Sequence, residues 1–297
     1  MKLLEKFRAL SADIQRIKAQ NHDLRLQIGT MLVKQTSSAT TFQDAEFKVF
    51  SQFGDDGIIQ YLIKNVNPTV NKFIEFGVEN YEESNTRFLL INNYWQGLVI
   101  DGSDTNIDYI KKDPIYWRHN LTAVNSFITA ENINDLIKEN GYANSAGLLS
   151  IDIDGNDYWV WKAITAVTPD IVIVEYNAIF GPDRPITIPY EAGFVRTNAH
   201  YSNLYRGASL AALYNLAIEK GYSFVGCNSA GNNAYFIKTT KLGPLGTLTP
   251  LEGFVQSHFR ESRHSDGTLS FADLDEQRKL ISGLPVFNVI TKQIEVF

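Results

Sequence analysis

The sequence has a single cysteine, Cys227, among its 297 residues. It can therefore form no internal disulfide and no cysteine-based zinc site, and a reducing, cytoplasmic setting is expected. Basic residues are not in excess either: the net charge is −6, whereas a nucleic-acid partner requires a basic surface. There is no signal peptide and no run of about 18 apolar residues, so neither export nor a membrane span is expected. With 44% apolar residues, the chain can bury one large core.

The glycine-rich pattern G-x-G-x-x-G of dinucleotide-binding proteins is also missing. In its place, residues 72–104 are typical of a strand, a turn, a helix and a second strand. The first strand ends in Glu75-Phe76-Gly77, and glycine suits the tight turn between a strand and a helix. The second strand ends at Asp101, where an acidic side chain can accept hydrogen bonds from both hydroxyls of a ribose. An ordinary βαβ unit with an unrelated Asp is the alternative.

Strands and helices continue to alternate along most of the chain. Continuous apolar strands separated by helices indicate a parallel sheet with helices on both faces. The last two strands are joined by residues 227–232, whose composition favours an antiparallel hairpin. The further strands are expected at 117–124, 147–151, 171–174, 222–226 and 233–238, and the helices at 107–112, 130–140, 158–167 and 209–220.

Polar side chains follow several of these strands at the point where each strand ends. Ligand sites in parallel sheets lie beyond the carboxyl ends of the strands, so these side chains should gather at one edge. Helix capping is the alternative role for Asp154 and Asp157. The six residues expected at the edge are Glu75, Asp101, Asp152, Asp154, Glu175 and Asn177.

The first 36 residues follow a heptad repeat instead. Ile at position a and Leu at position d, with a single Asn at a, favour a parallel two-stranded coiled coil. We therefore expect a homodimer, with a trimer as the alternative assembly; an amphipathic helix packed on its own domain is the other interpretation. The a positions are Phe7, Ile14, Asn21 and Ile28, and the d positions are Leu3, Leu10, Ile17, Leu24 and Met31.

These features resemble a known family, the class I S-adenosylmethionine-dependent methyltransferases. Glu75-Phe76-Gly77 is similar to the acidic-glycine motif after their first strand, and Asp101 to their ribose-binding acid. The segments 51–57 and 152–157 resemble the FkbM-like group, whose members often methylate hydroxyls of sugars or natural products. The resemblance implies an α/β Rossmann-like fold, a mostly parallel sheet with a terminal antiparallel hairpin, preceded by the coiled-coil helix. The expected division is a coiled-coil oligomerisation helix (1–36), a linker (37–49), a methyltransferase-like domain (50–240) and a C-terminal extension packed on it (241–297).

The resemblance also implies roles for particular residues. The expected S-adenosylmethionine contacts are Asp55, Glu75, Gly77, Asp101, Ser103 and Asp152. The expected catalytic residues are Asp152, Asp154 and His200, although a plain surface position is the alternative for this histidine. Asp152, Glu175 and Asn177 stand where some small-molecule O-methyltransferases hold Mg²⁺, and their oxygen atoms suit Mg²⁺ or Mn²⁺.

The predicted function is O-methylation of a hydroxyl on a sugar, glycan or related small molecule, with assistance from a divalent metal as an open option. The insertion 180–206, rich in Pro, Tyr and Arg, is the expected acceptor-recognition segment. Two alternatives belong to other classes. Asp152-x-Asp154 also matches the D-x-D pattern with which nucleotide-sugar glycosyltransferases hold Mn²⁺ on a diphosphate. The second is a non-catalytic scaffold whose working part is the coiled coil.

Overall fold

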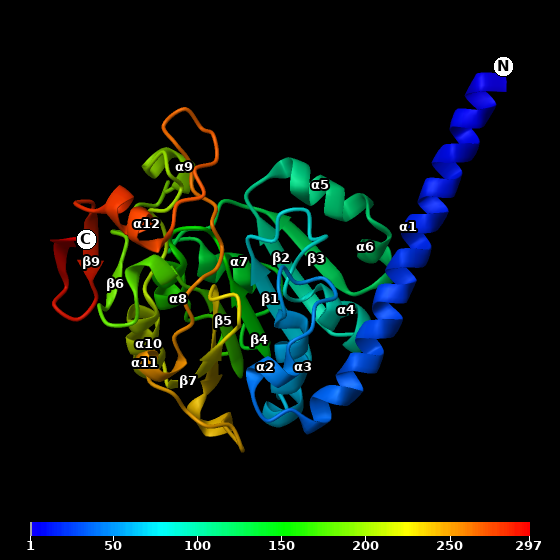
Figure 1. Ribbon diagram of the computed structural model, residues 1–297. Helices are drawn as coiled ribbons and strands as arrows, with labels where there is room; N and C mark the ends of the chain where they lie inside the picture. Colours follow the sequence, from blue (N-terminus) through cyan, green and yellow to red (C-terminus); the bar gives the residue numbers. More distant parts are fainter. Residues whose placement is uncertain (1) are drawn as a thin grey trace.

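A seven-stranded sheet forms the centre of the molecule in a computed structural model, which describes residues 2–297 (Figure 1). The strand order is β3-β2-β1-β4-β5-β8-β7. All pairs are parallel except those of β8, which is antiparallel to both β5 and β7. The predicted parallel sheet with a terminal hairpin is therefore confirmed. The strands are β1 (Lys72–Phe76), β2 (Gln96–Asp101), β3 (Leu121–Asn125), β4 (Leu148–Ile151), β5 (Ile171–Glu175), β7 (Tyr222–Cys227) and β8 (Asn233–Lys238).

Helices cover both faces of the sheet, because side chains alternate between two apolar cores along each strand. In β1, Ile74 and Phe76 point into one core and Phe73 into the other. The helices of the first core are α7 (Ile133–Glu139), α8 (Asp157–Ala163) and α10 (Leu210–Glu219). Those of the second core are α3 (Asp55–Val66), α4 (Arg87–Asn93), α5 (Asp104–Lys112) and α6 (Pro114–Arg118).

The third strand begins later than the sequence suggested. A strand over 117–124 was expected, but α6 continues to Arg118 and β3 starts only at Leu121. The side chain of Asp113 accepts a hydrogen bond from the backbone N–H of Ile115, 2.8 Å away, and caps this helix. Proline at the first helical position suits such a start, since it has no N–H to leave unpaired.

A second, three-stranded sheet joins the insertion after β5 to the C-terminal segment. Its order is β10-β9-β6, with both pairs antiparallel. Ile281 of α12 packs with Ile186 and Phe180 in a separate core beneath this sheet. The two segments are thus fastened together beside the main sheet (Figure 1). The elements of these two segments near the second sheet are β6 (Ile186–Thr187), α9 (Arg196–Ala199), α12 (Leu274–Ile281), β9 (Pro285–Asn288) and β10 (Gln293–Val296), whereas α11 (Pro250–Gly253) packs on β7.

The C-terminal part of helix α1 (Lys2–Gln35) packs on the domain with one face, while its N-terminal part projects into solvent (Figure 1). On the docked face, a β-carbon at Gly29 would come within 2.6 Å of Val49, so the helix approaches closely there. The side chain of Leu3, a predicted d position, lies outside the described residues. Within residues 2–297, no helix combines the length and the apolar character needed to cross a membrane. The heptad positions that face solvent are Phe7, Leu10, Ile14, Ile17, Asn21, Leu24, Ile28 and Met31.

The segment 37–49, predicted as a linker, is folded against the domain. After a short 3₁₀ turn, it forms α2 (Phe42–Ala45), whose start is stabilised by mutual hydrogen bonds between Thr41 and Asp44. Phe42 and Ala45 are buried. The connection between α1 and the sheet is therefore ordered and held by buried apolar side chains.

Candidate functional site

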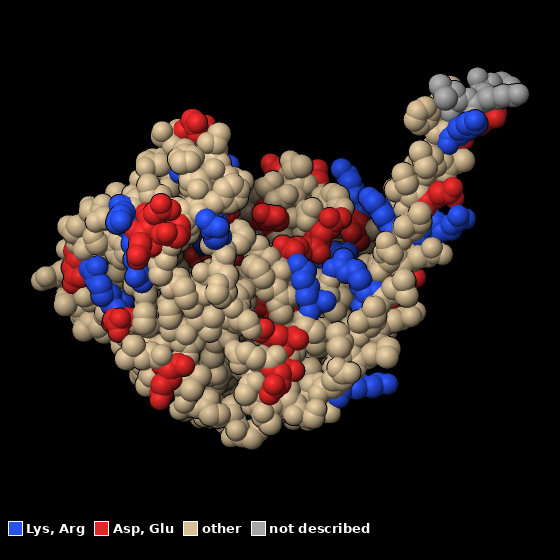
Figure 2. All heavy atoms as spheres, in the orientation of Figure 1, with Lys and Arg blue, Asp and Glu red and all other residues tan. Residues whose placement is uncertain are grey.

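A cavity of about 430 Å³ opens at the carboxyl ends of the parallel strands. Residues after β1, β2, β3, β4 and β5 line it, together with parts of the insertion and of the C-terminal segment. In the space-filling view, acidic side chains gather around this hollow (Figure 2). The cavity brings together all six of the polar residues expected at this edge, Glu75, Asp101, Asp152, Asp154, Glu175 and Asn177.

Gly77 brings the loop after β1 against the end of β4. Its φ of +70° lies in the left-handed region, which glycine adopts without strain. A β-carbon here would lie 1.6 Å from the backbone oxygen of Asp152, so only glycine fits. At Gly77, the cavity wall is therefore formed by backbone atoms alone.

The carboxylate of Glu75 is used mainly inside the protein. Its Oε1 accepts a hydrogen bond from the backbone N–H of Asn85 at 2.9 Å. Its Oε2 accepts from the hydroxyl of Ser84 at 2.9 Å and from the backbone N–H of Thr86 at 3.1 Å. Burial raises the pKa of Glu75, and the hydrogen bonds from Thr86 and Ser84 oppose this rise. Glu75 thus shapes the cavity wall by holding the segment that begins α4.

Asp101 ties the loop after β1 to the start of α5. Its Oδ2 accepts from the backbone N–H of Glu79 at 2.8 Å. Its Oδ1 accepts from the backbone N–H of Ser103 at 2.9 Å and from the side chain of Asn106 at 3.1 Å. Each carboxylate oxygen can accept two hydrogen bonds, so Oδ2 retains room for one more. Ser103 itself caps α5 and is not among the residues that line the cavity.

Asp55 lies away from the cavity. Its Oδ1 accepts hydrogen bonds from the side chains of Asn228 at 3.0 Å and Asn233 at 2.9 Å, and from the hydroxyl of Tyr235. These bonds fix the start of α3 to the β7–β8 hairpin. The predicted cofactor contact of Asp55 has no counterpart in the cavity lining, and a structural role accounts for the position.

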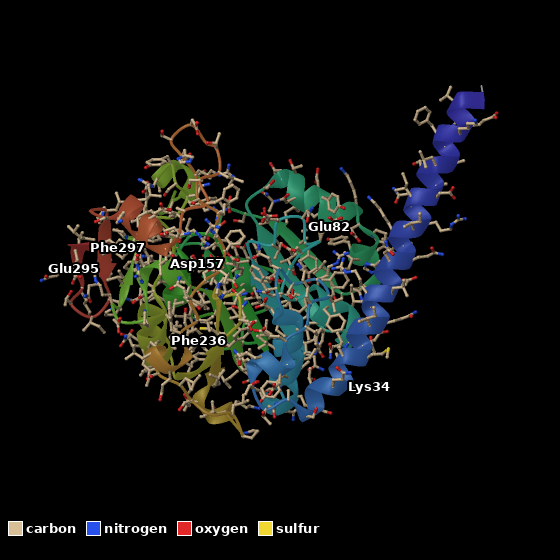
Figure 3. All side chains as sticks on the ribbon, in the orientation of Figure 1. Lys34, Glu82, Asp157, Phe236, Glu295 and Phe297 are labelled. Atoms are coloured by element: carbon tan, nitrogen blue, oxygen red, sulfur yellow. The ribbon has the colours of Figure 1, made fainter. Side chains whose placement is uncertain are left out.

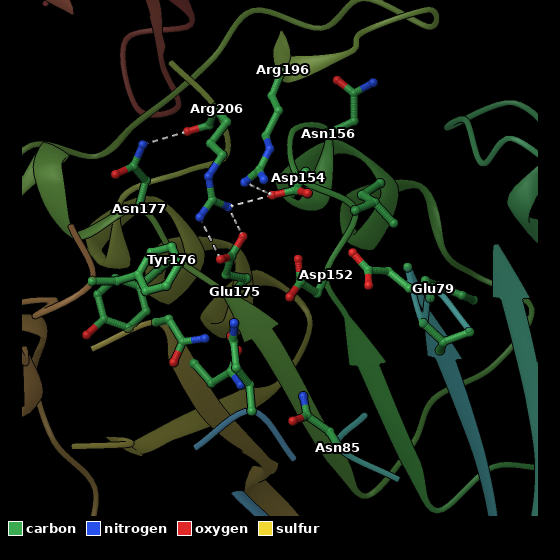
Figure 4. Close-up of a pocket in the computed structure, with 18 of the residues that line it drawn as sticks. Glu79, Asn85, Asp152, Asp154, Asn156, Glu175, Tyr176, Asn177, Arg196 and Arg206 are labelled. Carbon is green, nitrogen blue, oxygen red and sulfur yellow. Dashed lines mark hydrogen bonds and ion pairs between the residues drawn. The ribbon is translucent and has the colours of Figure 1, made fainter. Parts of the chain in front are cut away.

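Two arginines from the insertion bind the carboxylates on the other side of the cavity (Figure 4). Arg206 forms a two-pronged ion pair with Glu175, in which one arm lies 2.8 Å from Oε1 and the other contacts Oε2. The same guanidinium lies 3.1 Å from Oδ1 of Asp154. Arg196 also contacts Asp154, at 2.8 Å. Asp154 has a φ of +56°, a strained conformation of the kind found at functional sites.

Asp152 differs from its neighbours because its carboxylate faces the cavity without a partner (Figure 4). In the described part of the chain, no hydrogen bond or ion pair engages this side chain. Burial raises its pKa well above the ordinary value, and the charges of Glu175 and Asp154 raise it further. Arg206 acts in the opposite direction. Asp152 is therefore a carboxylate with a stronger than usual affinity for a proton.

The predicted metal ligands do not fit a metal in this arrangement. Arg206 occupies both oxygens of Glu175. The amide of Asn177 is also committed: its Nδ2 donates to the backbone oxygens of Leu204 at 3.0 Å and Arg206 at 2.9 Å. Its Oδ1 accepts from the backbone N–H of Ile179 at 3.1 Å. Of the predicted set, only Asp152 has a side chain that makes no hydrogen bond or ion pair within the described part of the chain.

His200 lies outside the cavity lining. Its Nδ1 is 2.7 Å from the hydroxyl of Ser202, and its ring stacks on Tyr201. Burial lowers its pKa below the ordinary value. The predicted catalytic role of His200 therefore has no counterpart in the lining of this cavity.

Other lining residues escaped the sequence reasoning. Phe127 follows β3 by two residues, and the strand-end rule could have found it had it been applied to apolar as well as polar residues. Phe194, Phe259 and Glu261 reach the cavity from the insertion and from the C-terminal segment. No motif marks them, because their positions depend on how distant loops fold back.

The sheet has the strand order of one fold in particular. An antiparallel β8 between β5 and β7, at the end of a parallel α/β sheet, is the plan of the class I methyltransferases. The chain has the class I methyltransferase fold. Its cavity lies beyond the carboxyl ends of the strands, where open α/β sheets bind their ligands.

Solved structures with low identity include proteins described as methyltransferases. An S-adenosylmethionine-dependent methyltransferase from Clostridium acetobutylicum is 12% identical, with a TM-score of 0.39 over 61% of this chain and 88% of that one. An O-methyltransferase family protein from Burkholderia thailandensis is 11% identical, with a TM-score of 0.36 over 69% and 59%. The N-terminal domain of EvdMO1 with SAH bound is 9% identical, with a TM-score of 0.40 over 64% and 81%. No protein-family model and no curated protein matches the sequence.

Proposed function

We propose that this protein is an S-adenosylmethionine-dependent O-methyltransferase of the FkbM-like group. The observation that carries the proposal is the pairing of two features in one cavity. Asp101, at the end of β2, has a free acceptor position where the fold binds a ribose, and Asp152, at the end of β4, offers an unpartnered carboxylate. One cavity therefore contains both a cofactor side and a proton-accepting side.

The cofactor side is formed by the ends of β1, β2 and β3. The backbone at Gly77 allows a close approach, Asp101 accepts a hydrogen bond from a ribose hydroxyl, and Phe127 offers an aromatic face to the adenine. When bound, S-adenosylmethionine supplies a methyl group on a positively charged sulfur. The acidic lining of the cavity complements that charge.

The acceptor side supplies position and a proton acceptor. An in-line transfer needs the hydroxyl oxygen held close to the methyl group, and the hydroxyl must lose its proton. Asp152 accepts this proton, because its carboxylate is free and its proton affinity is raised. Asp154 contributes by anchoring Arg196 and Arg206 rather than by touching the reacting atoms.

The composition of the acceptor side favours a polyhydroxylated molecule such as a sugar. The amide side chains of Asn156, Asn203 and Gln277 can both donate and accept hydrogen bonds, and Phe194 and Phe259 offer flat apolar faces. A glycosyltransferase is less well supported. Its D-x-D motif would need Asp154 to bind a metal ion, whereas Oδ1 of this carboxylate is already paired with Arg196 and Arg206.

The exposed face of α1 supports assembly through a parallel coiled coil. Its apolar heptad positions face solvent along the whole described helix, while a different face docks on the domain. We propose a homodimer with both domains at the same end of the stalk.

Calorimetry with S-adenosylhomocysteine tests the proposed function. We expect binding of one molecule per chain and competition by S-adenosylmethionine, whereas nucleotide diphosphate sugars should not bind. A panel of sugar and glycan acceptors with methyl-labelled cofactor would then identify the product. Binding of a nucleotide sugar without binding of S-adenosylhomocysteine would refute the proposal in favour of a glycosyltransferase.

A further inference from the structure

The guanidinium of Arg206 lies among three carboxylates at the end of the sheet. Oxygen atoms of Asp152, Asp154 and Glu175 lie within 4.8 Å of one another, a spacing that one cation can bridge. Arg206 already contacts two of the three, with two hydrogen bonds to Glu175 and a 3.1 Å ion pair to Asp154. Its side chain is only 17% exposed.

We propose that Arg206 is a built-in cation that occupies the place of a divalent metal, so that this carboxylate cluster is closed to metal ions. The exclusion of metal follows from the contacts of Arg206 alone. Its consequence for catalysis, a metal-independent methyl transfer, rests on the proposed function.

Asn177 explains why Arg206 stays in place. The side-chain amide of Asn177 donates a hydrogen bond to the backbone oxygen of Arg206 and another to that of Leu204. Asn177, predicted as a metal ligand, therefore fixes the backbone of residues 204–206, and this backbone positions the side chain of Arg206. A guanidinium also matches a carboxylate with two parallel hydrogen bonds, a geometry that resists displacement.

The charges of the cluster fit this assignment. The cluster contains three carboxyl groups, those of Asp152, Asp154 and Glu175, and two guanidinium groups, those of Arg206 and Arg196. Asp152 is left as the unmatched carboxylate. A metal ion can promote deprotonation by binding the hydroxyl oxygen directly, whereas a guanidinium whose donors point at carboxylates cannot. Proton removal therefore falls to Asp152.

Mn²⁺ binding tests the proposal without any measurement of activity. The full-length wild-type protein, titrated with Mn²⁺ alone and followed by electron paramagnetic resonance, should bind no ion at this cluster at millimolar concentration. Arg206→Ala should gain one Mn²⁺ per chain, with at least tenfold tighter binding than any wild-type site. The double variant Arg206→Ala/Asp152→Asn should lose most of that gain, because one of the three oxygen ligands is removed.

Arg196→Ala is the matched control. Arg196 also contacts Asp154, but it does not touch Glu175, so its removal leaves Arg206 in place and should add no Mn²⁺ site. If Arg206→Ala does not fold, Arg206→Met, which keeps most of the side-chain volume, replaces it. If neither folds alone, rescue of folding by Mn²⁺ supports the proposal and failure of rescue counts against it.

Two results would overturn the inference. One is an Asp152-dependent Mn²⁺ site in the wild-type protein, and the other is a folded Arg206 variant that gains no site. S-adenosylhomocysteine binding by the wild-type protein is measured in parallel. If the wild-type protein does not bind S-adenosylhomocysteine, the proposed function is refuted, but the result on metal exclusion still stands.

Discussion

The α-carbon of Gly77 lies directly against the backbone carbonyl of Asp152. A β-carbon on Gly77 would come within 1.6 Å of that oxygen, far inside van der Waals contact. Through this contact, the loop after β1 and the end of β4 meet, and both segments line the cavity. The distance between the cofactor side and Asp152 therefore depends on residue 77 being a glycine, which has no side chain.

Gly77→Ala should destabilise the protein and distort the cavity. Alanine would be strained by about 1–2 kcal/mol at a positive φ, and the clash with the backbone adds about 1–3 kcal/mol. Gly141→Ala is the matched control, since Gly141 has a φ of +80° but no atom within 4 Å of its virtual β-carbon. Denaturant unfolding should show a larger loss for Gly77→Ala. Equal losses of unfolding free energy in the two variants would mean that the positive φ alone causes them and that the contact with Asp152 contributes nothing.

Asp101→Ala should weaken S-adenosylhomocysteine binding. A hydrogen bond to a charged group is worth about 1.5–3 kcal/mol, which corresponds to roughly ten- to a hundredfold in affinity. Asp104→Ala, which removes an exposed carboxylate at the start of the following helix α5, is the control and should bind normally. Unchanged affinity of Asp101→Ala in calorimetry would show that the ribose lies elsewhere.

Asp152→Asn should lower kcat by about 10²- to 10⁴-fold, the usual contribution of a general base. Asparagine keeps the size of the side chain but cannot accept the proton. S-adenosylhomocysteine affinity should change much less, which separates proton transfer from cofactor binding. A variant with full turnover on an identified acceptor would exclude Asp152 as the base.

The heptad face of α1 should assemble the chain into a dimer. Light scattering of the full-length protein at micromolar concentration should give twice the chain mass, and a truncated variant that lacks residues 1–20 should be a folded monomer. That truncation keeps the docked part of α1, whose Leu26 and Val33 pack on the apolar cluster of Val49, Phe50 and Phe88. Asn21→Ile should raise the melting temperature and loosen the selection of two strands. A monomeric full-length protein would exclude the coiled coil.

Ionisation of Asp56 should make the protein less stable as the pH rises. Burial raises its pKa from 3.8 to about 6, although hydrogen bonds from Ser51 and Val49 oppose the shift. Because the folded state binds the proton more tightly, this stabilisation is complete below the unfolded value and is lost as the pH passes about 6. A pKa difference of about two corresponds to about 3 kcal/mol.

Asp56→Asn should therefore gain stability relative to the wild type between about pH 4 and pH 7, by up to about 3 kcal/mol in denaturant unfolding. Asp44→Asn should behave in the opposite way, since hydrogen bonds from Thr41 and Thr40 lower the pKa of Asp44. If the stability difference from the wild type changed with pH in the same direction for both variants, the opposite pKa shifts of Asp56 and Asp44 would be contradicted.

The sheet was predictable from local patterns. Its strands are apolar runs that end in polar residues, so the placement of Glu75, Asp101 and Asp152 at one edge follows from the topology of parallel sheets. The start of β3 was misplaced because residues 117 and 118 belong to a helix initiated by proline.

The assignment of partners was not predictable in the same way. The sequence marks Asp55 as an acid beside a glycine, but not its bonds to Asn228 and Asn233, far along the chain. The insertion was expected to bind the acceptor, whereas its Arg206 turns back to Glu175. Such pairings depend on how a long connection folds, and neither periodicity nor spacing encodes that path.

The docking of α1 has a mechanical consequence. Because α1 packs on the domain through Gly29 and Leu26, its direction relative to the domain is fixed. Its free end extends beyond the body of the domain (Figures 1 and 3). In a parallel pair, the distance and the angle between the two cavities would be set by the helix itself. An acceptor with repeating units could then bind both cavities of the dimer at once. After the first site is occupied, the effective concentration of the acceptor at the second site would be high.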